Sequence, residues 1–282
     1  MITRFAPSPT GPLHLGHAYS AILAHTRAKS AGGQFLLRIE DGDPARCRPE
    51  WEDLIYQDLD WLGLEWQRPV WRISDRTADY SAALDRLTDM GLTYPCSCTR
   101  RDIAEAHGAP QGDLPIGPDG VIYPGTCRHR HGTHAGPNDA IRLDMARAIA
   151  LLGPDRMLTY RETGPYGTGI HFIDLDALQT KVGDVVLFRR DTGMAAYHLT
   201  VVVDDAAQNV TEAVRGADLI PATQIHCLLQ AILGLPTPDY HHHRLICDED
   251  GKRLAKRNDA KAIRKYRDEG LSPDDIRHLI GL

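Results

Sequence analysis

Apolar residues recur at steps of three and four along several stretches of the chain, and this spacing predicts amphipathic helices. The first such stretch begins at Leu15 and ends before Gly32, a residue that readily takes the left-handed conformation that stops a helix. The same spacing predicts helices over residues 50–62, 79–90 and 223–233. Each of these helices needs an apolar surface to pack on.

Uninterrupted apolar runs predict the buried strands that supply this surface. Residues 35–41 and 197–205 have this pattern, as do residues 140–143 and 185–188 in a smaller α+β piece. Alternation of strands and helices predicts an α/β fold of the Rossmann type, with a parallel sheet and helices on both faces. Ligands bind beyond the carboxyl ends of such strands, which is where Glu40 lies.

The composition changes at Tyr94, after which Gly, Pro, Cys and His become frequent up to about residue 137. Such a stretch cannot build an apolar core alone and needs an additional stabilising link, such as a bound metal ion. We therefore expect an insertion between two halves of the core. The expected divisions are residues 1–93 (first half), 94–190 (insertion with a zinc-binding loop and the small α+β subdomain), 191–240 (second half) and 241–282 (basic segment and C-terminal helices).

The charge distribution argues against a general nucleic-acid binder, because the net charge of the 282 residues is −6. Residues 252–267 nevertheless carry eight Lys/Arg and one acidic residue, which permits a local contact with RNA. The chain has no long uncharged apolar run and no signal-peptide pattern at its start. We expect a soluble, cytoplasmic monomer that has no membrane partner.

The sequence His14-x-Gly16-His17 follows a proline-rich turn and opens the first predicted helix. The unpaired N–H groups and the dipole of a helix start attract phosphate. Far along the chain, residues 251–257 (Gly-Lys-Arg-Leu-Ala-Lys-Arg) form a basic segment. Alone, the first segment could be an ordinary loop with two histidines, and the second could be a solvated run of charges. The two segments together, in this order, favour a nucleotide site.

This pair of segments resembles the HIGH and KMSKS signatures of class I aminoacyl-tRNA synthetases, and residues 4–11 (Arg-Phe-Ala-Pro-Ser-Pro-Thr-Gly) resemble the glutamyl branch. The resemblance implies a Rossmann-type catalytic core that binds ATP together with Mg²⁺. It implies that His14, His17 and Lys256 contact ATP and have catalytic roles. It also implies that Gly16 contacts ATP. Arg253 and Ala255 depart from the Lys and Ser usual in the family, which we expect to weaken the ordering of this segment rather than abolish activity.

Binding L-glutamate means pairing two carboxylates and one ammonium, so it needs at least two cations and one anion. By resemblance to the glutamyl branch, Arg4 and Arg215 are the cations, Glu40 is the anion, Tyr197 gives a hydroxyl and a ring wall, and Ser8 gives a small polar contact. Which arginine binds which carboxylate stays open. The implied glutamate site comprises Arg4, Phe5, Ala6, Pro7, Ser8, Glu40, Tyr197 and Arg215.

Three clustered cysteines, Cys96, Cys98 and Cys127, predict one structural zinc ion with a fourth ligand. Zinc often binds histidine together with cysteine, so one of the histidines that follow Cys127 could be the fourth ligand, and we retain His129 as this candidate. Similarity to the small glutamyl-queuosine tRNA(Asp) synthetases, which have the pattern Cys-x-Cys…Tyr-x-x-x-Cys, implies Tyr123 instead. Consecutive residues point in different directions, so we expect the run 241–243 of three histidines to pack and hydrogen-bond rather than share one metal ion.

The resemblance to these small synthetases extends to function. The chain ends about 25 residues after the basic segment, so we expect no anticodon-binding domain. The resemblance implies activation of L-glutamate by ATP without tRNA, followed by transfer to the queuosine base of tRNA(Asp). Two alternatives are a truncated glutamyl-tRNA synthetase that charges a tRNA 3′ end and a non-catalytic paralogue that binds RNA or an amino acid, which the altered residues Arg253 and Ala255 would favour.

Overall fold

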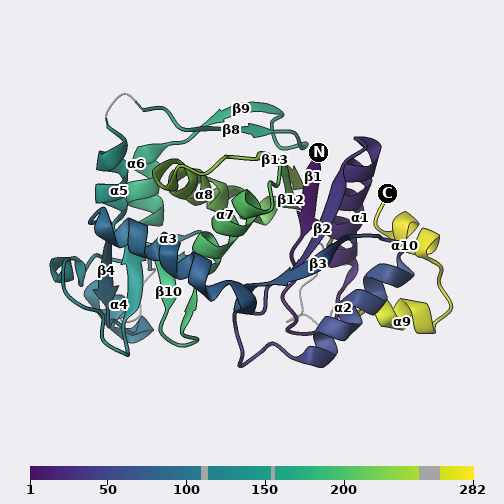
Figure 1. Ribbon diagram of the computed structural model, residues 1–282, viewed down its shortest axis with the longest axis horizontal. Coiled ribbons are helices and arrows are strands. Elements are labelled where there is room, and N and C mark those ends of the chain that lie inside the picture. The colour runs from purple at the N-terminus through teal and green to yellow at the C-terminus, as the bar shows by residue number, and fades with distance from the viewer. Residues whose placement is uncertain (109–113, 154–155, 248–260) are drawn as a thin grey trace.

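The computed structural model describes residues 1–108, 114–153, 156–247 and 261–282 (Figure 1). The first half of its core consists of β1 (Ile2–Phe5), α1 (Leu15–Ser30), β2 (Gln34–Ile39), α2 (Pro49–Trp61) and β3 (Gln67–Arg72). The strand β2 lies between β1 and β3, and both pairings are parallel. The helices predicted from Leu15 and over residues 50–62 are thereby confirmed.

The second half of the core consists of β12 (Glu212–Gly216), β13 (Asp239–His243), β8 (Thr159–Glu162) and β9 (Gly169–Phe172). The strand β13 pairs in parallel with β12 and β8, and β9 closes the edge as an antiparallel strand. The halves meet where the Thr211 N–H donates to the Ile2 carbonyl at 2.9 Å. The strands β1, β2 and β3 follow one another outward on one side of the crossover between β1 and β12, and β12 and β13 follow one another outward on the other side, as in a doubly wound fold. The predicted parallel sheet is confirmed, and this crossover is where such sheets bind ligands.

The prediction of a strand over residues 197–205 is wrong, because these residues form the helix α7 (Tyr197–Ala207). This helix packs against α3 (Thr77–Asp89) and α8 (Ile220–Leu233). Burial from several sides requires apolar residues around the helix, so its sequence lacks the polar face that would have identified it. The helices predicted over 79–90 and 223–233 are confirmed as α3 and α8.

A second, antiparallel sheet lies largely within residues 94–190 and contains both strands of the expected small α+β piece, 140–143 and 185–188. The strands β8 and β9 also lie within residues 94–190, but they pair with the core sheet. The boundaries of the expected divisions stay a prediction. The sheet order is β11–β10–β7–β4, and its edge strand β11 (Met194–Ala195) lies just beyond the expected insertion. The other elements of this region are β4 (Thr93–Cys96), α4 (Arg100–Ala106), β5 (Ile116–Gly117), β6 (Gly120–Val121), β7 (Ala140–Leu143), α5 (Met145–Leu152), α6 (Leu175–Ala177) and β10 (Val186–Arg189).

Two short helices, α9 (Ile263–Asp268) and α10 (Pro273–Leu279), lie beside α1 and α2 in Figure 1, at the opposite end of the molecule from α4. Ile263 and Ile276 are fully buried in the same apolar cluster as the inward residues of α1 and α2. This packing attaches the C-terminal helices to the first half of the core. Among the described residues, no helix is both long enough and apolar enough to cross a membrane.

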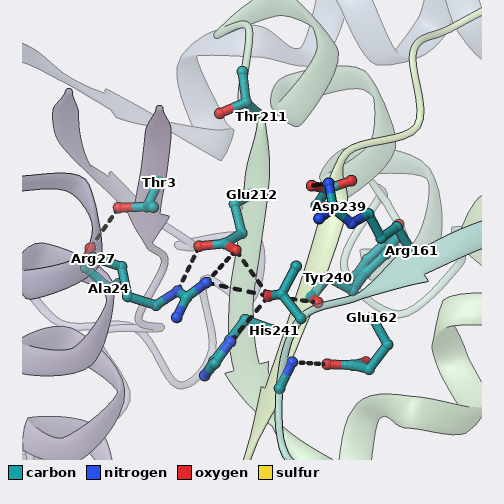
Figure 2. A network of polar contacts seen from close by, with 12 residues as sticks. Thr3, Ala24, Arg27, Arg161, Glu162, Thr211, Glu212, Asp239, Tyr240 and His241 are labelled. Atoms are coloured by element: carbon teal, nitrogen blue, oxygen red, sulfur yellow. Dashed lines mark hydrogen bonds and ion pairs between the residues drawn. The ribbon is translucent and has the colours of Figure 1, made fainter. Parts of the chain in front are cut away.

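An ion pair between partly buried Arg27 and buried Glu212 connects α1 to β12. Figure 2 shows Arg27 reaching from α1 to Glu212, whose two carboxylate oxygens each lie 2.6 Å from a guanidinium nitrogen. The Thr163 hydroxyl, at the end of β8, donates to the same carboxylate at 2.8 Å. Burial raises the pKa of Glu212, but the hydrogen bonds from Arg27 and Thr163 outweigh this effect, and the pKa is lowered.

We expect Glu212→Gln to lower the free energy of unfolding by about 2 kcal/mol at neutral pH, because Arg27 then loses its counter-ion at a partly buried site. A carboxyl group with a lowered pKa contributes stability above its unfolded pKa and loses it as the pH falls through the folded pKa. The gap between wild type and variant should therefore be constant above about pH 5 and close at lower pH. Urea denaturation at several pH values measures this gap; a gap that is independent of pH would contradict the assignment.

Candidate functional site

Two histidines cap the start of α1 reciprocally. The His14 Nδ1 accepts from the Gly16 N–H at 3.1 Å, and the His17 Nδ1 accepts from the His14 N–H at 3.1 Å. Their rings lie 3.8 Å apart. Because both Nδ1 atoms accept, the proton of each neutral ring is on Nε2, which makes each ring a donor. The helix start therefore combines its own positive dipole with two imidazole donors.

A cavity of about 470 Å³ opens at the crossover between β1 and β12. It is lined by most of the residues that the sequence pointed to, and these come from both halves of the core. The predicted residues in its wall are Arg4, Phe5, Ala6, His14, Gly16, His17, Glu40, Tyr197 and Arg215. Ser8 lines a neighbouring cavity of about 270 Å³ that shares Glu40 and Tyr197, and the Pro7 carbonyl accepts from the Glu40 N–H at 3.0 Å. Lys256 lies outside the described residues.

Arg4 shares a carboxylate partner with a second arginine inside the protein. Its Nε lies 3.1 Å from the Asp205 carboxylate, which also lies 2.8 Å from Arg38. Arg38 is fully buried and lies 3.6 Å from Glu40, so it positions both carboxylates. Burial raises the pKa of Glu40 against the opposing effect of Arg38 and Arg4. We did not predict Arg38 or Asp205, although a period of two along β2 places Arg38 on the same face as Glu40.

Arg215 has a different environment, because its described partners are all uncharged. Its guanidinium donates to His242 Nε2 at 3.2 Å, to His226 Nδ1 at 3.0 Å and to the Thr223 hydroxyl at 2.5 Å. Burial and the nearby Arg215 charge lower the pKa of His242 to about 4 and that of His226 well below its ordinary value, so both rings are neutral. Arg215 is only 5% exposed, and no carboxylate among the described residues forms an ion pair with it. Its positive charge lies in the cavity wall, and none of its described hydrogen-bond partners is a counter-ion.

The three histidines of residues 241–243 pack and hydrogen-bond separately, as expected. His241 contacts Thr163 at 3.0 Å, His242 contacts Glu162 at 2.5 Å, and His243 contacts the Ser20 hydroxyl at 2.7 Å. Their partners differ because side chains alternate across β13. The sequence analysis did not identify His242 and His226 as partners of Arg215, since these contacts depend on how separate elements pack.

The insertion brings the three predicted cysteines together. The Cys96, Cys98 and Cys127 sulfur atoms lie within 4.8 Å of one another, and this is a geometry that could hold a metal ion. The Tyr123 hydroxyl lies 3.4 Å from Cys96 Sγ and 3.3 Å from Cys98 Sγ. The rival, His129, has an exposed side chain whose Nδ1 contacts the Thr126 carbonyl at 2.9 Å. Tyr123 is therefore the better placed of the two candidates for a fourth ligand.

The chain is similar to known proteins in both sequence and fold. The family model for the catalytic domain of class I tRNA synthetases (E and Q) matches residues 1–130 and 173–282. A glutamyl-Q tRNA(Asp) synthetase of Rhodobacter capsulatus is 56% identical over 100% of both chains, and that of Nocardia farcinica is 42% identical over 98% of this chain and 82% of its own.

Solved structures show the same fold. Glutamate-tRNA synthetase from Elizabethkingia anophelis has a TM-score of 0.79 at 26% identity, and the likeness covers 100% of this chain and 61% of that one. A glutamate tRNA ligase from Elizabethkingia meningosepticum, solved in complex with its amino acid, has a TM-score of 0.78 and is covered over 60% of its length. This chain thus spans about three fifths of those synthetases. Its match to the catalytic-domain model and its full-length likeness to the Rhodobacter protein show that the chain is a class I aminoacyl-tRNA synthetase-like ligase and belongs to the glutamyl-Q tRNA(Asp) synthetase family.

Proposed function

We propose that the enzyme activates L-glutamate with ATP in the absence of tRNA and then transfers the glutamate to the queuosine base of the tRNA(Asp) anticodon. The observation that carries the proposal is the buried charge of Arg215, which faces the cavity with only uncharged partners among the described residues. An anionic substrate supplies the missing counter-ion. The name of the Rhodobacter capsulatus relative, glutamyl-Q tRNA(Asp) synthetase, supports both glutamate and this tRNA.

In the activation step, Arg215 and Arg4 receive the two glutamate carboxylates and Glu40 receives the ammonium, while Tyr197 forms a wall of the cavity. ATP, with Mg²⁺, binds over the start of α1. One α-carboxylate oxygen attacks the α-phosphorus, and pyrophosphate leaves with the bonding electrons. This chemistry needs positioning and positive charge rather than a protein nucleophile, so donors at the helix start suit it.

The His14 and His17 Nε2–H groups are the donors that we assign to the phosphate and ribose side of ATP, and Gly16 permits close approach there. In the transfer step, a hydroxyl of the queuosine cyclopentene ring attacks the acyl carbon of glutamyl-adenylate. AMP leaves, and the hydroxyl proton passes to solvent. Because the adenylate is a high-energy acyl donor, no dedicated general base is required.

Two assays test the proposal. Glutamate-dependent exchange of pyrophosphate into ATP without tRNA should occur, and its absence would favour a non-catalytic paralogue. Labelled glutamate should become attached to tRNA(Asp) that carries queuosine and not to the same tRNA without it. Labelling of the tRNA that lacks queuosine would instead show charging of a 3′ end.

Lys256 is the cation that we assign to the β- and γ-phosphates of ATP. We expect Lys256→Ala to slow adenylate formation about tenfold, since the neighbouring cations of residues 252–257 keep part of the positive field. Glutamate affinity should change less than about twofold. Single-turnover formation of labelled glutamyl-adenylate measures the first quantity and calorimetric titration the second. Lys181→Ala, at an exposed position of the insertion, is the matched control; an unchanged rate for Lys256→Ala would show that the assignment is wrong.

A further inference from the structure

A line of hydrogen bonds runs from Arg215 outward to the insertion. Arg215 Nη1 lies 3.0 Å from His226 Nδ1, and His226 Nε2 lies 3.0 Å from His198 Nδ1. The line ends at Asp119, whose Oδ1 lies 2.9 Å from His198 Nε2. His226 and His198 are 1% and 3% exposed, so bulk water offers these rings no alternative partners. Asp119 lies in the turn between β5 and β6, far from Arg215 in sequence.

The guanidinium at one end determines where every proton along this line lies. An arginine N–H can only donate, so His226 Nδ1 accepts and the proton of His226 is on Nε2. His226 Nε2–H then donates to His198 Nδ1, and the proton of His198 lies on Nε2 and is donated to Asp119. The opposite set of tautomers would place the His226 Nδ1–H against an N–H of Arg215. A carboxylate, which only accepts, is the matching terminus.

A second carboxylate acts on the other side of Arg215 in the same way. Arg215 Nε donates to His242 Nε2, so the His242 proton lies on Nδ1 and is donated to Glu162 at 2.5 Å. Arg215 is therefore held between two neutral rings, each oriented by a carboxylate that does not touch the guanidinium. This arrangement fixes the direction of the guanidinium without neutralising it as a direct ion pair would. The charge stays available to a ligand in the cavity.

We propose that Asp119 is a positioning residue for the amino-acid site: through His198 and His226 it holds Arg215 in the orientation that receives a substrate carboxylate. This inference rests on the proposed role of Arg215 in glutamate binding. Asp119 is not among the residues that line the cavity, so it acts through the two rings. The hairpin that carries it continues directly into Tyr123 of the cysteine cluster, and the insertion thereby takes part in amino-acid binding.

Asp119 also offers a clean experiment, because its side chain is 46% exposed and its removal leaves no cavity in the core. We expect Asp119→Ala to weaken L-glutamate binding about five- to tenfold in calorimetric titration without ATP, the factor that loss of one hydrogen bond in a network gives. Asp119→Asn, whose amide oxygen can still accept from His198, should lose about twofold. ATP affinity should stay within about twofold in both variants. Asp60→Ala, at an exposed position of α2, is the control and should bind as wild type.

Nitrogen-15 NMR of labelled histidine gives a readout that a merely structural role would not change. In the wild type, His226 and His198 should both be neutral with the proton on Nε2, and in Asp119→Ala the His198 signal should show a mixture of tautomers. A wild-type His226 that carries its proton on Nδ1 would overturn the proposal. In the His198→Asn background, where the line is already cut, Asp119→Ala should cause no further loss of glutamate affinity.

The remaining outcomes separate this proposal from the proposed function. If Asp119 merely stabilised the hairpin, Asp119→Ala would lower the unfolding temperature and leave glutamate affinity at the wild-type level. That result would overturn the role of Asp119 and leave the proposed function intact. If the wild-type protein did not bind glutamate at all, the proposed function would fail first, and the role of Asp119 would fail with it.

Discussion

Replacing Arg215 by alanine is expected to weaken glutamate binding about a hundredfold and to leave ATP affinity within about twofold. The guanidinium is buried, and its described hydrogen-bond partners are uncharged, so a substrate carboxylate can serve as its counter-ion. Loss of a buried charge-assisted contact costs about 3 kcal/mol, which corresponds to this factor. Calorimetric titration with L-glutamate in the absence of ATP measures the change. Arg215→Lys should recover only part of it, because an ammonium cannot reproduce the planar fork of arginine.

A parallel titration with L-glutamine determines which carboxylate Arg215 binds. If Arg215 pairs with the side-chain carboxylate, Arg215→Ala should lose affinity for glutamate and much of its preference over glutamine. If it pairs with the α-carboxylate, both ligands should lose affinity together. Arg101→Ala, at a side chain that is 86% exposed, controls for loss of a positive charge. If glutamate affinity were unchanged in Arg215→Ala, the role of Arg215 on which the proposed function depends would be wrong.

The fold class could be predicted from the sequence because one strand of the core sheet, β2, is a short apolar run between two periodic helices. The strands β8 (Thr-Tyr-Arg-Glu) and β13 (Asp-Tyr-His-His-His) were not predicted, because they contain few apolar residues. The same rule failed for residues 197–205, since a helix buried from several sides and a buried strand present the same continuous apolar run. Asp204 and Asp205 look like carboxylates at the end of a strand, but they lie inside the helix and pair with arginines of other elements. Asn209, with φ of 53°, stops α7 and was the local signal for a helix.

The sequence pointed to Tyr197 as a site residue, although it did not predict the helix α7 that carries it. Tyr197 lines the cavity even though it opens a helix and not a strand, because the start of α7 lies at the same crossover. The partners of Arg215 could not have been predicted in this way. His198, His226 and His242 come from α7, α8 and β13, and no spacing along the chain links residues whose relation depends on how those three elements pack.

Loss of a cysteine from the cluster in the insertion is the other large effect that we expect. The wild-type protein should contain one zinc ion per chain by elemental analysis, bound by Cys96, Cys98, Cys127 and Tyr123. Cys98→Ser should release the metal and lower the free energy of unfolding by about 3 kcal/mol or more, because binding to a structural site contributes directly to folding. Treatment of the wild type with a strong chelator should have the same effect. Thermal denaturation with and without added zinc measures it.

Cys247→Ser is the matched control, since Cys247 is exposed and lies outside the cluster. It should keep the metal and the wild-type stability. Tyr123→Phe and His129→Ala then decide the fourth ligand, because only the variant that removes a ligand should weaken zinc binding. Loss of stability in Cys98→Ser from a wild-type protein that contains no metal would refute the zinc site. The three thiols would then stabilise the insertion by packing and hydrogen bonding, with the Cys127 N–H donating to the Tyr123 hydroxyl at 2.9 Å as part of that network.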